Sequence, residues 1–291
     1  MDDKDTVKYV AEQFAPHLTD VKLFGGADYA NVCKHLEEVP ALVEPTAAAC
    51  LGRKPADRAV GPGSLLIHFM QLPPPLHHSI LQRHFRNGHL NLQCMLMHDF
   101  AKEDAVAWVF ADIGKQIAQL APIRAFNLCM NYLPDGLADT LLQRLAPHTA
   151  LASLRLRGNC LGAASARTLH LLLTTALTNV QNIDLSDNKL SNADLHQISQ
   201  AFSTLPRLEH LALVGTGLTG SAAEPFFRQI MRLGGLRTLD LSDNNLGDAG
   251  LAALGSVLAT TPAVPAVTRL ALSRVGCALS LIHISEPTRP Y

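Results

Sequence analysis

The 291-residue sequence contains few aromatic residues and has no excess of charge of either sign. Aromatic residues make up only 5% of the chain, whereas 48% is hydrophobic, so the core must be built mainly from aliphatic side chains. The 24 basic and 25 acidic side chains nearly cancel, giving a net charge of −1. This balance argues against a general role in binding nucleic acid or another polyanion.

Signals for export and membrane insertion are also missing. The first ten residues, MDDKDTVKYV, are acidic and contain no apolar run, so they are not a signal peptide. No apolar run is long enough to span a bilayer, so no membrane partner is expected. The six cysteines show no paired spacing that would indicate a disulfide framework. We therefore expect a soluble cytoplasmic or nuclear protein with reduced thiols.

What the sequence does contain is a repeated unit, seen most clearly in residues 236–250, LRTLDLSDNNLGDAG. Leu239 and Leu241 alternate with the polar Asp240, which is the period-2 pattern of a short strand. An asparagine and two glycines then turn the chain, and leucines at helical spacing follow from Leu251. The unit therefore predicts a strand, a turn and a helix.

The same pattern occurs five more times. The six units begin at Ile123, Leu151, Val180, Leu208, Leu236 and Val267. The intervals between these residues are 28, 29, 28, 28 and 31 positions, so residues 123–278 form one array. The pattern and its spacing resemble the leucine-rich repeats of the ribonuclease-inhibitor type. The resemblance implies an α/β solenoid, a horseshoe with parallel strands on its concave face and helices on its convex face.

A physical argument leads to the same architecture. Each unit exposes an apolar flank that only the next unit can bury, so neighbouring units stack. Parallel strands lie about 4.8 Å apart, whereas packed helices need about 8–10 Å. The difference bends the stack so that the strands line the inside of the curve.

The ninth position of the unit is expected to form a buried hydrogen-bond ladder between adjacent turns. Four of the six units carry asparagine there, at Asn131, Asn159, Asn188 and Asn244. The fourth unit has Thr216, which can replace the amide only in part, and the sixth has Val275, which cannot replace it. We therefore predict a weaker ladder at these two units.

The rest of the chain is less regular. Residues 1–60 are predicted to form an α-helical N-terminal cap, and residues 61–122 a degenerate, repeat-like segment. That segment contains a predicted strand at Leu90 and Leu92 and an amphipathic helix from Val106 to Leu120. Residues 279–291, which contain LSLIHISEPTR, resemble a translated sequencing adapter. We interpret them as a non-native tail and expect the natural protein to continue beyond Ala278.

Two motifs that suggest ligands have simpler interpretations. Residues 215–220, GTGLTG, match the G-x-G-x-x-G of a dinucleotide site, with Asp240 twenty residues beyond. Because Thr216 and Leu218 are in register with the repeat, the repeat already explains this motif, and no cofactor is predicted.

A group of histidines lacks the cysteine pair and the spacing of a zinc site. They are His77, His78, His84, His89 and His98. The adjacent residues 73–75 are all proline, which predicts a loop or, as a less favoured alternative, a polyproline ligand. We interpret the histidines as surface residues and predict no metal.

Side chains around the strand leucines are predicted to face the concave side, where the charges are mixed in sign. Arg155 and Asp184 occupy equivalent positions on neighbouring strands, so they could form an ion pair. Asp187 and Asp243 belong to SDN turns and are interpreted first as consensus residues. A small patch of Cys129, Met130, Ala212 and Val214 could help to seat a partner. The predicted partner-binding residues are Arg124, Asn127, Arg155, Arg157, Asp184, Asp187, His210, Arg237, Asp240, Asp243 and Arg269.

No arrangement typical of a catalytic site is found at positions that the fold would bring together. The main hypothesis is therefore a non-enzymatic scaffold that binds a protein on its concave face. One alternative is a GTPase-activating regulator of the Ran type, because the same repeat subtype occurs in that class. The other is the sensor part of a larger receptor.

Overall fold

The computed structural model describes residues 66, 69–70, 74–96, 103–220, 223–260 and 267–276. The predicted cap at residues 1–60 and the predicted tail at residues 279–291 lie outside them. The described elements, in chain order, are α5 (Pro74–Arg83), β1 (Phe85–Arg86), β2 (His89–Asn91), α6 (Glu103–Gln119), β3 (Ala125–Asn127), α7 (Asp135–Leu142), η3 (Gln143–Leu145), β4 (Ser153–Arg155), α8 (Ala163–Thr175), β5 (Asn182–Asp184), α9 (Asn192–Gln200), η4 (Ala201–Thr204), β6 (His210–Ala212), α10 (Ala223–Ile230), β7 (Thr238–Asp240), α11 (Gly247–Thr260) and β8 (Arg269–Ala271).

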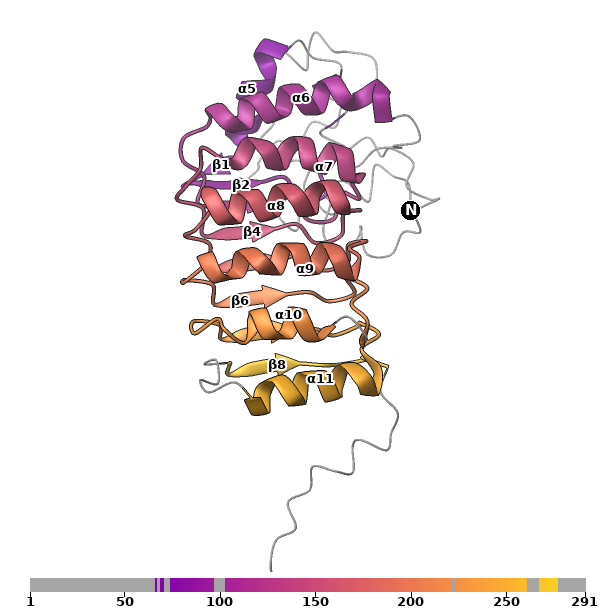
Figure 1. Cartoon of the computed structure of the whole chain (residues 1–291). Coiled ribbons are helices and arrows are strands. Elements are labelled where there is room, and N and C mark those ends of the chain that lie inside the picture. Colours follow the sequence, from indigo (N-terminus) through magenta and orange to yellow (C-terminus); the bar gives the residue numbers. More distant parts are fainter. Residues whose placement is uncertain are drawn as a thin grey trace, which may run out of the picture.

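The strands form a single sheet in sequence order, from β1 to β8. From β2 onward every neighbouring pair is parallel and equivalent residues lie opposite one another, as Leu154 does Ile183. Figure 1 shows the strands stacked side by side, with the helices in a second layer over one face of the sheet. The predicted alternation of strand and helix is thus confirmed, and it is consistent with a solenoid.

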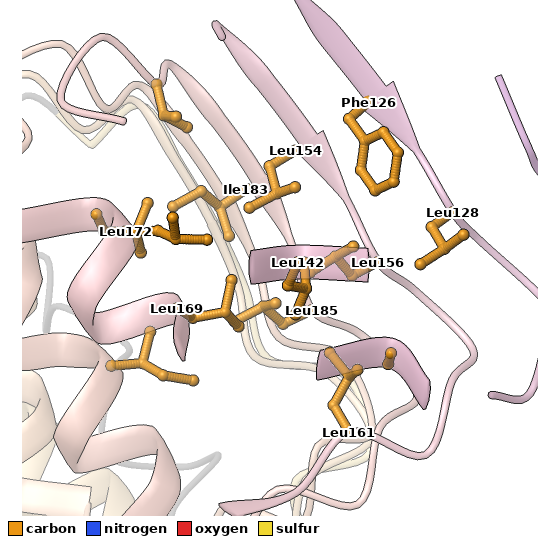
Figure 2. Close-up of a cluster of buried hydrophobic side chains, with 14 of the residues drawn as sticks. Phe126, Leu128, Leu142, Leu154, Leu156, Leu161, Leu169, Leu172, Ile183 and Leu185 are labelled. Carbon is orange, nitrogen blue, oxygen red and sulfur yellow. The ribbon is translucent and has the colours of Figure 1, made fainter. Parts of the chain in front are cut away.

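The core lies between the sheet and the helices and is almost entirely aliphatic. The middle residue of each strand from β2 to β7 is at most 2% exposed. Figure 2 shows Leu154 and Leu156 of one unit pointing towards the same interior as Ile183 and Leu185 of the next. The helical Leu169 closes this interior from the other side. Replacing one such leucine by alanine costs roughly 2–5 kcal/mol of unfolding free energy.

The predicted asparagine ladder is present. The side-chain amide of Asn159 donates to the carbonyls of Leu128 at 3.0 Å and Leu156 at 2.9 Å, one in each of two adjacent units. Its oxygen accepts from the Leu133 amide at 3.1 Å. Asn131, Asn188 and Asn244 make the same kind of bonds at their own junctions. The ladder thus satisfies buried backbone groups that water cannot reach.

The ladder is weaker at the two predicted places. The Thr216 hydroxyl donates to the Leu213 carbonyl at 3.1 Å and to Asn244 at 3.2 Å, but among the described residues it makes no bond to the preceding unit. The Leu190 amide, which asparagine would serve there, has no hydrogen bond within the described part of the chain. At Val275, the Leu246 amide likewise has no hydrogen bond within the described part of the chain. The predicted weaker ladder at the fourth and sixth units is therefore confirmed.

A second set of bonds joins the starts of successive helices. The Asp135 carboxylate, in the first turn of α7, accepts from the backbone of Gly162, Ala164 and Ser165 at 2.8–3.0 Å, at the start of α8. Burial raises the pKa of Asp135, but these hydrogen bonds and the Ser165 side chain outweigh burial and hold it below its usual value. Two units later, Asn192 accepts from the Thr219 amide at 3.1 Å, a similar bond without a titrating group.

The amino-terminal end of the described chain extends the sheet. The predicted strand and amphipathic helix are confirmed as β2 and α6. β2 pairs with β3 in the repeat register, and β1 runs antiparallel along its other side. β1 therefore covers the outer edge of β2, which would otherwise be open.

The predicted loop at the proline run is wrong where it is described. Pro74 and Pro75 begin α5, where proline lacks only an amide that would have no helical partner. His77 on this helix is fully buried, with Nδ1 2.6 Å from an Asp112 carboxylate oxygen in α6. His77 is therefore not a surface residue, because α5 packs against α6. His98 lies outside the described residues.

Candidate functional site

The sheet surface opposite the helices, which we call the strand face, carries the polar side chains of every strand. In each strand from β2 to β7 the middle residue is directed to the core and its two neighbours are directed to this face. Asn127, Arg155, Asp184 and Asp240 are third residues of their strands, and His210 and Arg269 are first residues. Arg124 and Arg237 directly precede strands, whereas Arg157, Asp187 and Asp243 lie in the turns that follow them.

Most of the charged residues on the strand face are paired, but not in the predicted way. Among the described residues, Arg155 and Asp184 form no ion pair, so that prediction is wrong. Instead Arg157 Nε lies 2.7 Å from an Asp187 oxygen, one turn further along. Arg157 lies in the turn after β4 and contacts the next unit, whereas Arg155 is the last residue of β4 itself.

Two further ion pairs also join residues of adjacent repeat units. Arg274 donates through two nitrogens to the Asp243 carboxylate, one of them at 2.6 Å, and this contact lowers the pKa of Asp243. Arg237 Nε lies 3.3 Å from Glu209. All three pairs are exposed to solvent, so we expect each to contribute little to folding.

The SDN turns have a clear backbone role. Asp187 and Asp243 have φ angles of 53° and 58°, in the left-handed region. Gly158 and Gly215 occupy the same position in other units with φ angles of 68° and 60°. Glycine and aspartate tolerate this conformation better than most residues, although Met130 and Arg274 adopt it at the same position with φ angles of 59° and 55°. This backbone role is consistent with interpreting the two aspartates first as consensus residues, which stays a prediction.

The predicted apolar patch divides into two. Cys129 and Met130 follow β3 and pack against Cys94 in a small cluster of their own. Burial raises the pKa of the Cys129 thiol to about 11, and the nearby Asp184 carboxylate adds to this effect. Ala212 and Val214 belong to β6 and its turn, and β4 and β5 separate them from the first group.

The three glycines of residues 215–220 each have a role in the repeat. Gly215 and Gly217 have φ angles of 60° and 87°, where L-residues are strained. At Gly220 an added Cβ would lie 2.1 Å from the Leu246 carbonyl oxygen, so only glycine allows the two units to approach. These roles explain the motif without a nucleotide.

Some polar contacts on the strand face were missed by sequence reasoning. Asn127 donates to Gln93 at 3.1 Å, which extends the polar surface into the degenerate unit. His210 Nδ1 lies 2.7 Å from the Thr238 hydroxyl on β7. The register of equivalent positions would have predicted the second contact, whereas the first required the repeat frame to be extended before Ile123.

Within the described residues, no group of three or more histidine, cysteine or acidic side chains could hold a metal ion. None of the helices described is both long and apolar enough to cross a bilayer.

The comparisons with known proteins agree with the repeat architecture. A family model described as "Leucine Rich repeat" matches residues 236–255. Tonsoku-like protein of Mus musculus is 32% identical over 204 residues, which cover 57% of this chain and 14% of that protein. The protein of the same name from Bos taurus is 33% identical, over 58% of this chain and 12% of its own length.

Ribonuclease inhibitor of Sus scrofa is 29% identical over 150 residues, covering 51% of this chain and 33% of the inhibitor. The chain therefore spans about a third of that relative and about a seventh of the mouse protein. Together with the fold, these matches support a leucine-rich repeat protein.

Proposed function

We propose that this chain is a non-enzymatic scaffold, built from leucine-rich repeats of the ribonuclease-inhibitor type, that binds a protein partner through its strand face. Relatives of this kind make protein interaction the general expectation. The proposal assigns no catalytic step to the chain and takes the strand face to be the concave one.

One observation supports this function above the others. From β2 to β8, side chains of matching position are aligned in rows across parallel strands that pair without a register shift. The backbone beneath these rows is fixed by the asparagine ladder. A rigid surface of this kind loses little conformational entropy when a partner binds.

The test is affinity capture with the full chain, followed by mass spectrometry. The strand-face variant carries Arg155→Glu and Asp240→Lys, and the matched control carries Arg167→Glu and Glu224→Lys on α8 and α10. Both variants keep the net charge unchanged. We expect proteins that bind wild type to be retained by the control and reduced at least tenfold by the strand-face variant. Equal capture by both variants, with both folded by circular dichroism, would refute the proposal.

A further inference from the structure

The strand face changes character at β6, between two nearly identical neighbours. β5 and its turn read NIDLSDN, and β7 and its turn read TLDLSDN, whereas β6 and its turn read HLALVGT. Across this row, Asp184 pairs in register with Ala212, and Ala212 with Asp240. In the turn, Gly215 lies between Asp187 and Asp243, because its Cβ position would be 2.9 Å from one side chain and 4.0 Å from the other.

The result is a strip of short side chains with aspartates on both sides. Ala212, Val214 and Gly215 are all half-buried and project less than the flanking residues. We call this strip the β6 strip. The sheet geometry places Asp184 and Asp240 two strand spacings apart, which is about 9–10 Å. An incoming extended segment therefore meets an apolar floor between two acidic walls.

The four aspartates differ in how far their charge is balanced. Asp187 and Asp243 each have an arginine partner, whereas Asp184 and Asp240 form no ion pair within the described residues. One oxygen of Asp184 accepts from the Ser186 amide, and one of Asp240 from the Ser242 amide, both at 3.0 Å. These bonds hold the carboxylates in place and leave the second oxygen of each without a hydrogen-bond partner in the described chain.

The nearby arginines do not neutralise the β6 strip. Arg157 and Arg274 are held by Asp187 and Asp243, and Arg157 also lowers the pKa of Asp243. Arg155 lies opposite Asp184 in the β4–β5 register and forms no ion pair with it in the described chain. The four aspartates outnumber these three arginines by one, so the charge beside the strip is negative, even though the strand face as a whole is mixed in sign.

We propose that the β6 strip is the docking site for an extended basic segment of the protein partner, with two arginine or lysine side chains that reach Asp184 and Asp240. In an extended polyproline-II segment, residues three apart lie on the same side and about 9.3 Å apart. This spacing matches the separation of the two carboxylates, so the basic residues stand at positions i and i+3. The residues between them cover Ala212 and Val214. This inference rests on the proposed scaffold function and names the chemistry of its partner.

The test uses fluorescent synthetic peptides and the full chain. The probe is a proline-rich peptide with arginines at i and i+3, and the control peptides carry glutamates at these positions or arginines at i and i+6. Binding is measured by anisotropy at low and high salt, because exposed charge contacts weaken as salt screens them. We expect the i, i+3 peptide to bind at least tenfold more tightly than either control peptide.

The protein variants locate the binding site. Asp184→Asn with Asp240→Asn removes both charges, while the asparagine oxygens keep the bonds to the serine amides. The matched control, Asp139→Asn with Glu224→Gln, removes two carboxylates from α7 and α10. We expect the first pair to weaken peptide binding at least tenfold and the control pair to change it less than twofold.

Three results would overturn this inference: no binding of the i, i+3 peptide to wild type, no preference for that spacing, or equal weakening by both variant pairs. None of them would refute the scaffold function itself. If the charge-reversed strand face still loses captured partners while the peptide fails to bind, the scaffold proposal stands and the β6 strip is not its docking site.

Discussion

Two junctions of the same solenoid differ in how they are held together. Between the first and second units, Asn159 links buried backbone groups on both sides of the junction. Between the third and fourth units, Thr216 bonds only within its own unit and to the following one. Both junctions bury equivalent leucines, so the apolar core is shared and the polar ladder is what differs. Two units therefore stack without the asparagine when buried leucines, strand pairing and the Asn192–Thr219 bond hold them, whereas asparagine adds further buried bonds across the junction.

The largest expected effect is the loss of the ladder where it is complete. Asn159→Ala would leave the buried Leu133 amide without its acceptor and would remove one of the two side-chain bonds to the Leu128 carbonyl, which Asn131 also serves. We expect a loss of roughly 2–4 kcal/mol in unfolding free energy, because an unsatisfied buried group costs about 1–3 kcal/mol and each further lost hydrogen bond about 1 kcal/mol. Urea denaturation followed by circular dichroism measures this loss.

Thr216→Val is the matched change at the incomplete junction. It removes only the two hydroxyl bonds, and we expect it to cost less than half of the Asn159→Ala effect. Equal losses for the two variants would contradict the proposed difference between the junctions.

The next effect concerns the bonds between helix starts. We expect Asp135→Ala to cost about 1–2 kcal/mol at pH 7, as the loss of a strong helix cap does. Because the pKa of Asp135 is lower in the folded chain than its ordinary value, its contribution is complete above that ordinary value. It is lost as pH falls through the folded value.

Asp135→Asn provides the control, since Asn192 makes an equivalent contact as an uncharged amide. Stability curves between pH 7 and pH 2 should show a smaller acid-induced loss for Asp135→Asn than for wild type. Identical acid dependence in the two proteins would show that this carboxylate does not carry the effect.

A smaller effect, this time a gain in stability, is expected when the incomplete ladder between the third and fourth units is restored. Thr216→Asn would place a side-chain oxygen where it can accept from the Leu190 backbone amide, which has no hydrogen bond within the described part of the chain. We expect a gain of about 1 kcal/mol in unfolding free energy. Thermal unfolding should show a higher midpoint. A lower midpoint would mean that the junction has adapted to threonine and has no room for the larger side chain.

The smallest effect is expected on the strand face. Arg157→Ala breaks an ion pair whose side chains are 41% and 42% exposed, so it should cost under about 1 kcal/mol, and less at high salt. A larger loss in denaturant titrations would mean that the strand face contributes to folding as the ladder does. The expected result leaves its charges available for binding.

The sequence was sufficient for the parts of this protein that repeat. The leucine spacing predicted the strands β3–β8, and the ninth position predicted both the complete and the incomplete junctions. It succeeded because each unit makes the same contacts with its neighbour, so one local pattern specifies a long-range contact. It failed at α5, where the prolines suggested a loop, since packing against α6 could not be read from that segment alone.

On the strand face, the sequence determined which side chains are exposed, because alternation along a strand decides the side on which each lies. It could not determine which of them pair. Arg157 reaches Asp187, whereas Arg155 and Asp184 form no ion pair in the described chain, and that choice depends on where the backbone places each residue, on a strand or in the turn that follows it. The repeat frame already places Asp184, Ala212 and Asp240 at equivalent positions of β5, β6 and β7, but only the tertiary structure shows that neither carboxylate forms an ion pair within the described chain. Periodicity specifies the scaffold, whereas the balance of charge on its surface depends on distances between units.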